Sequence, residues 1–335
     1  MKNIKIAQLL EQYPFTSDFF EQNRLDISGH EELTFPEYLA RLEEQTLEDC
    51  AIDLESLPGE LETYIEQMLK FLGLDNAQQI RSLSILPGTD KLGSPEQFEE
   101  LILLPSQIIS IVGPTGSGKS RLLADIEWTA QGDTPTSRKI LINGVVPDLK
   151  WRYSPQNKLV AQLSQNMNFV MDLNVSEFLT MHAQSRMTAN AGEIIKRIYA
   201  EANELAGESF SPNTPVTSLS GGQSRALMIA DTAILSTSPI VLIDEIENAG
   251  IDRGKALELL VSQDKIVLMA THDPLLALMA DKRIVIRNGG IAAVLETSPE
   301  EKQILQELKQ IDQVTQRARQ RLRRGDKLYQ KEILC

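Results

Sequence analysis

Cysteine, histidine and long apolar runs are scarce in this chain of 335 residues. Its 2 cysteines, Cys50 and Cys335, are too few and too far apart for a disulfide framework or a thiolate metal site. No segment approaches the ~20 continuous apolar residues of a membrane-spanning helix, and the first residues lack the pattern of a signal peptide. We therefore expect a cytoplasmic protein, with a peripheral position at the inner membrane face as the alternative.

Basic residues are also in the minority. The chain has 47 Asp and Glu against 33 Lys and Arg, a formal net charge of −14. Because nucleic-acid backbones attract Lys and Arg, this charge argues against broad nucleic-acid affinity, and we expect no nucleic-acid partner. The length exceeds that of a usual single domain, so a second module is expected.

A glycine-rich segment at residues 113–120, GPTGSGKS, matches the phosphate-binding pattern G-x-x-x-x-G-K-[ST]. It follows an apolar run at Ile108–Val112, which predicts a strand buried on both faces of a parallel sheet. A helix is expected after it, from about Ser120 to Trp128. Because a phosphate-binding loop needs a strand before it and a helix after it, a plain glycine turn is the weaker interpretation.

The residue types of this segment fit a nucleoside triphosphate. Its glycines lack a Cβ, so successive backbone N–H groups can point inward at the phosphates. Lys119 would place its ammonium group beside the β- and γ-phosphates, and the Ser120 hydroxyl would coordinate Mg²⁺. The predicted nucleotide contacts here are Gly113, Pro114, Thr115, Gly116, Ser117, Gly118, Lys119, Ser120 and Arg121.

A second candidate phosphate contact and an acidic strand follow later in the chain. Residues 219–223 read LSGGQ, and a helix expected to begin near Gln223 would offer its N-terminus to an anion. Further on, the apolar run Ile240–Ile243 ends in Asp244 and Glu245. In an open α/β sheet, such carboxylates lie beside the ligand, so Asp244 would hold Mg²⁺ and Glu245 would act as the general base.

Taken in order, these motifs resemble those of the ATP-binding cassette (ABC) ATPases over about residues 84–298. The resemblance implies an α/β P-loop NTPase fold of the ABC type, in which a RecA-like core carries an antiparallel β subdomain and a helical subdomain. The helical subdomain is expected at residues 174–218. The implied activity is hydrolysis of ATP to ADP and phosphate, with ATP and Mg²⁺ as cofactors; ATP over GTP rests on the resemblance alone.

The resemblance also assigns roles to residues between and after these motifs. Gln165 lies where the family has its glutamine loop, and residues 248–252 resemble the loop that crosses to a second subunit. His272 follows a further buried strand, Ile266–Ala270, and is expected to contact the γ-phosphate. The implied catalytic residues are Glu245, His272 and Gln165, and the implied metal ligands are Ser120, Gln165 and Asp244.

The family's LSGGQ motif closes on ATP that another subunit holds. The glycine-rich loop and the LSGGQ motif of one chain cannot close on each other. The resemblance therefore predicts a second ABC subunit, by preference an identical chain, with ATP sandwiched at two symmetric sites. The expected contacts from this motif are Ser220, Gly221, Gly222 and Gln223.

The chain departs from the family pattern in three places. Ile246 and Glu247 replace the usual proline and Ser/Thr after the general base, and Arg121 stands where Thr or Ser is frequent. No Phe, Tyr or Trp lies between Gly73 and Gln97, so the aromatic residue that would stack on adenine is not evident. Base recognition is therefore weakly specified, while the retained catalytic residues predict that hydrolysis survives.

Residues 1–80 are expected to form an acidic helical accessory domain, with acidic residues outnumbering basic ones by 17 to 5. Within it, residues 9–28 (LLEQYPFTSDFFEQNRLDIS) and 46–57 (TLEDCAIDLESL) resemble small helical domains of the DUF1858 type, related to the N-terminal domain of iron–sulfur repair proteins. An acidic bundle that docks a protein is the favoured interpretation. Local signals predict helix starts at Thr34 with Pro36 and at Thr46 with Asp49, and a break at Pro58-Gly59 before a helix from Leu61 to Leu74.

Residues 299–335 are expected to form a C-terminal helix and tail, with the helix at residues 299–325 and a basic end. Two functional classes remain open. The protein is either a soluble ABC ATPase that drives a conformational change in a protein client, such as a metalloenzyme complex, or the ATP-binding subunit of a transporter with a membrane permease. The acidic module and the altered residues after Glu245 favour the first slightly.

Overall fold

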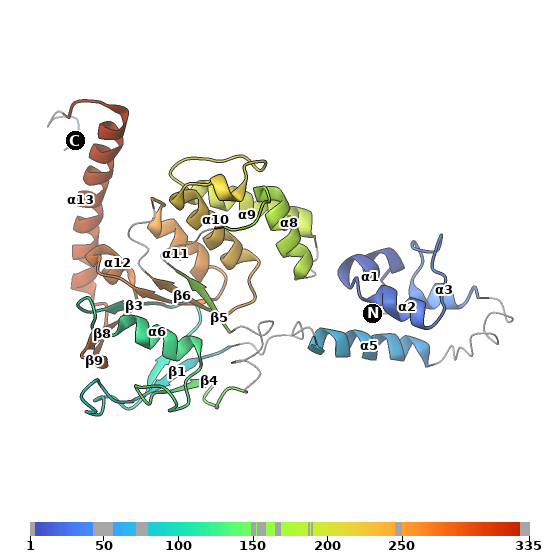
Figure 1. The fold of residues 1–335 in the computed structure, drawn as a ribbon, viewed down its shortest axis with the longest axis horizontal. Helices are drawn as coiled ribbons and strands as arrows, with labels where there is room; N and C mark the ends of the chain where they lie inside the picture. The colour runs from blue at the N-terminus through green and yellow to red at the C-terminus, as the bar shows by residue number, and fades with distance from the viewer. Residues whose placement is uncertain are drawn as a thin grey trace.

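The computed structural model describes residues 4–42, 56–71, 80–148, 152, 159–164, 169–186, 188, 190–244 and 250–328. Within these residues, a six-stranded sheet forms the centre of the α/β part (Figure 1). Neighbouring strands are parallel except for the last pair. Their order is β5 (Val160–Leu163), β6 (Ile240–Asp244), β7 (Ile266–Ala270), β3 (Ile108–Val112), β8 (Lys282–Arg287) and β9 (Gly290–Glu296).

Two hydrophobic cores lie on the two faces of this sheet. One contains residues of four helices, α8 (Val175–Ser185), α9 (Ala191–Leu205), α10 (Gly221–Ile234) and α11 (Arg253–Val261). The other contains residues of α6 (Lys119–Glu127) and of an antiparallel sheet with the order β2 (Leu101–Leu103), β1 (Leu83–Leu86) and β4 (Lys139–Ile142). A 3₁₀ turn, η1 (Val216–Ser218), precedes α10, and α12 (Pro274–Met279) follows β7.

Strand β6 shows why the middle strands have continuous apolar sequences. Val241 and Ile243 belong to the core beneath the four helices, whereas Ile240 and Leu242 belong to the core around α6. Successive side chains point to opposite faces of a strand, so a strand covered on both faces must be apolar throughout. The predicted strands at residues 108–112, 240–243 and 266–270 are confirmed, and β6 extends one residue further, to Asp244.

The helices predicted between residues 174 and 218 are present as α8, α9 and η1. Asn174 starts α8 with a reciprocal cap, because its side chain accepts from the Glu177 N–H at 2.9 Å and Glu177 accepts from the Asn174 N–H at 2.8 Å. Two apolar residues of these helices, Val175 and Ile198, are fully buried in the core of this helical group.

The N-terminal residues form helices around a core of their own. The helices are α1 (Ile6–Gln12), α2 (Thr16–Gln22), α3 (Phe35–Leu39) and α5 (Leu57–Phe71). Aromatic side chains fill much of this core, among them Phe19, Phe20, Phe35 and Tyr38. The helix start predicted at Thr34 is confirmed: Thr34 and Glu37 cap each other reciprocally, and Pro36 lies in the first turn.

The break predicted at Pro58-Gly59 is wrong, because α5 begins at Leu57 and includes both residues in its first turn. Proline is tolerated there because its missing N–H would have no acceptor within the helix. The capping pair predicted at Thr46 and Asp49 lies outside the described residues, as do Cys50 and Cys335.

The predicted C-terminal helix is confirmed as α13 (Pro299–Arg324), and Gly325 is its C-cap. Two ion pairs attach this helix to the α/β part: Arg283 contacts Glu301 at 2.5 Å, and Arg253 contacts Asp312 at 3.2 Å. Hydrogen bonds from the Ser298 N–H and then from Arg283 hold the pKa of Glu301 below its usual value. No helix in the described ranges combines the length and the apolar character that crossing a bilayer requires.

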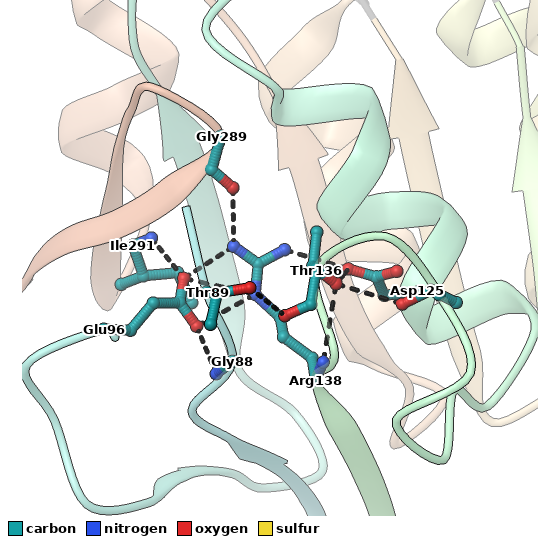
Figure 2. Close-up of polar contacts among 9 residues, drawn as sticks. Gly88, Thr89, Glu96, Asp125, Thr136, Arg138, Gly289 and Ile291 are labelled. Carbon is teal, nitrogen blue, oxygen red and sulfur yellow. Dashed lines mark hydrogen bonds and ion pairs between the residues drawn. The ribbon is translucent and has the colours of Figure 1, made fainter. Parts of the chain in front are cut away.

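A buried charged cluster lies between α6, the start of β4, the β1–β2 loop and the β8–β9 turn (Figure 2). Arg138, which is fully buried, contacts the Glu96 carboxylate at 2.6 Å and the Asp125 carboxylate at 2.9 Å. It also donates to the Gly289 carbonyl at 2.8 Å. Thr136 donates to the same Asp125 oxygen at 2.7 Å. The cluster therefore joins four separate segments of the chain.

We expect Arg138→Met to lower the free energy of unfolding by about 3–5 kcal/mol, because removal of the cation leaves two carboxylates buried without their partner. Urea denaturation measures the change. Arg287→Met, which alters an exposed arginine on the neighbouring strand β8, is the control and should change stability by less than about 0.5 kcal/mol. A loss below about 1 kcal/mol for Arg138→Met would contradict the structural role of the cluster.

Candidate nucleotide-binding site

Three predicted site segments lie at one edge of the central sheet. In the parallel ladder, Ile111 of β3 pairs with Ala270 of β7, and Ala270 pairs with Asp244 of β6. The carboxyl ends of these strands are therefore level. The glycine-rich loop after β3, the residues after β7 and the Asp244 carboxylate share this edge, which is where open α/β sheets bind ligands.

The glycine-rich loop needs glycine at two positions because it packs closely on neighbouring backbone. A Cβ at Gly113 would lie 2.5 Å from the Ile286 carbonyl oxygen, and a Cβ at Gly118 would lie 2.8 Å from the Gly289 Cα. Gly118 also has a φ of 109°, which side chains disfavour. The loop is thus seated on the turn between β8 and β9.

Lys119 is the first residue of α6, and its ammonium group lies over the loop. The Nζ atom donates to the Gly113 carbonyl at 2.9 Å and to the Pro114 carbonyl at 3.3 Å. Ser120 follows at the exposed start of the helix. The first turn of α6 contains no acidic residue, so no carboxylate there offsets its positive end. This arrangement suits a polyanion.

The remaining loop residues differ in exposure. Ser117 is buried, its hydroxyl has no hydrogen-bond partner among the described residues, and its carbonyl accepts from the Gly289 N–H at 2.7 Å. The exposed members of the predicted set are Pro114, Thr115, Gly116, Ser120 and Arg121. These exposed residues are accessible to a ligand at the sheet edge.

Asp244 is half-buried at the end of β6, and His272 is exposed two residues after β7. The segment after β7 is held in place because Asp273 caps α12 and contacts Arg253 at 2.5 Å. Across the described ranges, no group of three or more His, Cys, Asp or Glu residues is arranged to hold a metal ion. The Ser120 hydroxyl and the Asp244 carboxylate are nevertheless oxygen donors of the kind that Mg²⁺ takes when phosphates complete its shell.

Gln165 and Glu245, two predicted catalytic residues, lie outside the described residues. Their described neighbours are informative. Ser164 follows β5, whose last residue, Leu163, pairs with Ile243, and Asp244 ends β6. Both chain segments therefore arrive at the same sheet edge as the glycine-rich loop. The roles of Gln165 and Glu245 stay predictions.

The LSGGQ residues start α10, although the helix begins at Gly221 rather than near Gln223 as predicted. The two-residue difference follows from a reciprocal cap. The Ser220 hydroxyl accepts from the Gln223 N–H at 3.3 Å, and the Gln223 side chain accepts from the Ser220 N–H at 2.9 Å. Gln223 is therefore the third residue of the helix, and Gly221 and Gly222 form its first turn, beside the exposed Ser220.

Two residues at the glycine-rich loop were missed in the sequence. Lys91, from the β1–β2 loop, donates through Nζ to the Gly116 carbonyl at 2.9 Å. Gly289, from the β8–β9 turn, contacts Ser117 and Gly118 through its backbone. Neither belongs to a recognisable motif, because both reach the loop only through the packing of distant segments.

The fold and the motifs agree with comparisons to known proteins. The ABC transporter family matches residues 100–248. An uncharacterised ABC transporter ATP-binding protein of Methanocaldococcus jannaschii is 49% identical over 255 residues, which are 76% of this chain and 97% of that protein. The thiamine import ATP-binding protein ThiQ of a Chelativorans species is 30% identical over 207 residues, 59% of this chain and 80% of that protein.

A solved ATP-binding subunit of an ABC transporter superposes with a TM-score of 0.50 at 19% identity. The match covers 67% of this chain and 93% of that chain, and at this identity it supports the fold alone. The identity to the archaeal protein over nearly all of its length decides the family. This chain belongs to the ABC transporter family, as one of its ATP-binding proteins.

Proposed function

We propose that this chain is the ATP-hydrolysing subunit of an ABC membrane transporter. The observation that carries the proposal is the 49% identity to an ABC transporter ATP-binding protein over 97% of that protein. The acidic N-terminal module and the altered residues after Glu245 slightly favour a soluble ATPase with a protein client. The comparisons favour the transporter instead, because ThiQ, too, is named as an import ATP-binding protein.

In this proposal, the sheet edge binds the triphosphate. The backbone N–H groups of the glycine-rich loop and the positive end of α6 face the phosphates, and the Lys119 ammonium exchanges its carbonyl partners for phosphate oxygens. Ser120 and Asp244 would hold Mg²⁺, whose charge offsets that of the phosphates. Glu245 would accept a proton from the attacking water, and His272 and Gln165 would orient that water and the γ-phosphate.

The proposed working unit is a pair of chains. The exposed start of α10, with Ser220, Gly221 and Gly222, would close on ATP held by the glycine-rich loop of the partner. Hydrolysis removes the phosphate that joins the two halves, so the pair opens. Membrane subunits would convert this opening into transport, which places the protein at the inner face of a membrane through its partners.

We expect Lys119→Ala to weaken ATP binding about 10- to 100-fold, because the phosphates lose a charge-assisted hydrogen-bond donor. Isothermal titration calorimetry with Mg-ATP measures the dissociation constant. Lys302→Ala, on the exposed face of α13, is the matched control and should bind ATP as the unaltered protein does. Equal affinity of Lys119→Ala and the control would exclude this loop as the phosphate site.

We expect Glu245→Gln to form a stable dimer in Mg-ATP, because nucleotide contacts remain while the general base is lost. Light scattering measures the mass with and without ATP. The double variant Glu245→Gln/Ser220→Arg should bind ATP yet stay monomeric, because the larger side chain blocks closure at the start of α10. If the double variant still forms a dimer in Mg-ATP, the proposed role of Ser220 is contradicted.

Purification of the tagged chain from native membranes, solubilised in mild detergent, tests the transporter assignment. We expect polytopic membrane proteins to co-purify in a fixed ratio, because a transporter ATPase is held by its permease. The control is the Lys119→Ala variant, which should retain the permease even though it binds ATP poorly. Recovery with a soluble enzyme and no polytopic protein would favour the client-remodelling ATPase instead.

A further inference from the structure

The loop between β1 and β2 folds back over the glycine-rich loop and has a closed tip. The Asp90 carboxylate accepts from the Leu92 N–H and the Ser94 N–H, each at 2.8 Å, and the Asp90 N–H donates to the Ser94 carbonyl at 2.9 Å. Lys91 lies within this tip. Its backbone is therefore held by local hydrogen bonds, although its side chain is exposed.

Lys91 is directed at the glycine-rich loop by the β8–β9 turn. Its N–H donates to the Asn288 carbonyl at 2.8 Å, and its stem lies across Gly289, where an added Cβ would come within 2.9 Å of the Lys91 Cγ. From there the Nζ atom reaches the Gly116 carbonyl at 2.9 Å. A side chain at position 289 would displace this stem, so the small residue keeps the path open.

The buried charged cluster of Figure 2 anchors both segments that position Lys91. Glu96, which contacts Arg138, also accepts from the Gly88 N–H at 2.8 Å and from the Ile291 N–H. Gly88 and Glu96 bracket the loop tip, so both of its ends are attached to the cluster. The Gly289 carbonyl accepts from Arg138, which fixes the turn beneath the Lys91 stem.

Two ammonium groups thus lie on carbonyls of the same glycine-rich loop, Lys119 at Gly113 and Pro114 and Lys91 at Gly116. A phosphate oxygen is a better acceptor for an ammonium group than a neutral carbonyl, because the hydrogen bond is then charged at both ends. The chain has no aromatic residue between Gly73 and Gln97 to stack on a base. This stretch therefore offers no ring to stack on a base, so its contribution to a bound nucleotide has to come from polar groups such as Lys91.

We propose that Lys91 is a second cationic contact for the phosphates of the bound nucleotide, which its loop and the Arg138 cluster hold at the glycine-rich loop. This inference rests on the proposed ATP-binding function. Lys91 exchanges the Gly116 carbonyl for a phosphate oxygen when the nucleotide binds. Lys119, the first residue of α6, keeps its own contact with the phosphates, and Lys91 adds a second contact from the β1–β2 loop.

The test compares Lys91→Met, Lys91→Arg and the control Lys302→Met by isothermal titration calorimetry with Mg-ATP. Methionine keeps the stem that crosses Gly289 and removes only the charge. We expect Lys91→Met to bind ATP about tenfold more weakly, whereas Lys91→Arg and Lys302→Met retain the affinity of the unaltered protein. The tenfold difference should shrink as salt is raised, because the Lys91 ammonium is exposed to screening ions.

Equal ATP affinity of Lys91→Met and the unaltered protein, with both binding ATP, would overturn the role of Lys91 and leave the proposed function standing. An unaltered protein that fails to bind Mg-ATP at all would overturn the proposed function itself. Thermal unfolding of each variant separates a binding defect from a folding defect. Lys91→Met should have the same melting temperature as the unaltered protein, because the ammonium group that it removes is exposed.

Discussion

The parallel register of β6, β7 and β3 is the constraint on which the rest of the molecule depends. These strands are covered on both faces, so their side chains must be apolar throughout and their pairing is tightly specified. Because they run in the same direction and end level, Asp244, the residues after Ala270 and the glycine-rich loop meet at one edge. The candidate site is a consequence of how the core is packed.

The Arg138 cluster holds segments that lie outside the central sheet in fixed positions relative to the site. Removing a cation from water carries a large desolvation penalty. Its carboxylate partners offset that penalty only when most of the cation's N–H donors form hydrogen bonds. Arg138 uses them on Glu96, Asp125 and the Gly289 carbonyl. The result is geometric: the β1–β2 loop, α6 and the β8–β9 turn are held together around the glycine-rich loop.

The N-terminal helices form a unit whose purpose the ABC assignment does not explain. They have a separate, aromatic-rich core, and acidic residues dominate their sequence. The similarity of this unit to DUF1858-type domains stays a prediction, as does its role in docking a protein.

Much of the fold and most of the candidate site could be predicted because the deciding signals are local. Continuous apolar runs indicated β3, β6 and β7, and glycine, lysine and acidic residues at fixed spacing indicated a triphosphate site. Prediction fails where local signals compete: Pro58-Gly59 predicts a break but fits the first turn of α5, and Gln223 predicts a helix start but is the cap partner of Ser220.

The sequence by itself determined the middle strands of the sheet and the family, and it predicted the phosphate-binding chemistry, since each depends on short segments whose residues are adjacent in the chain. Only the tertiary structure decided that Glu96, Arg138 and Gly289 act together and that Lys91 reaches the glycine-rich loop. These contacts join residues that are far apart in the sequence. The spacing of residues along the sequence does not predict these contacts, because the packing of the whole core sets their distances.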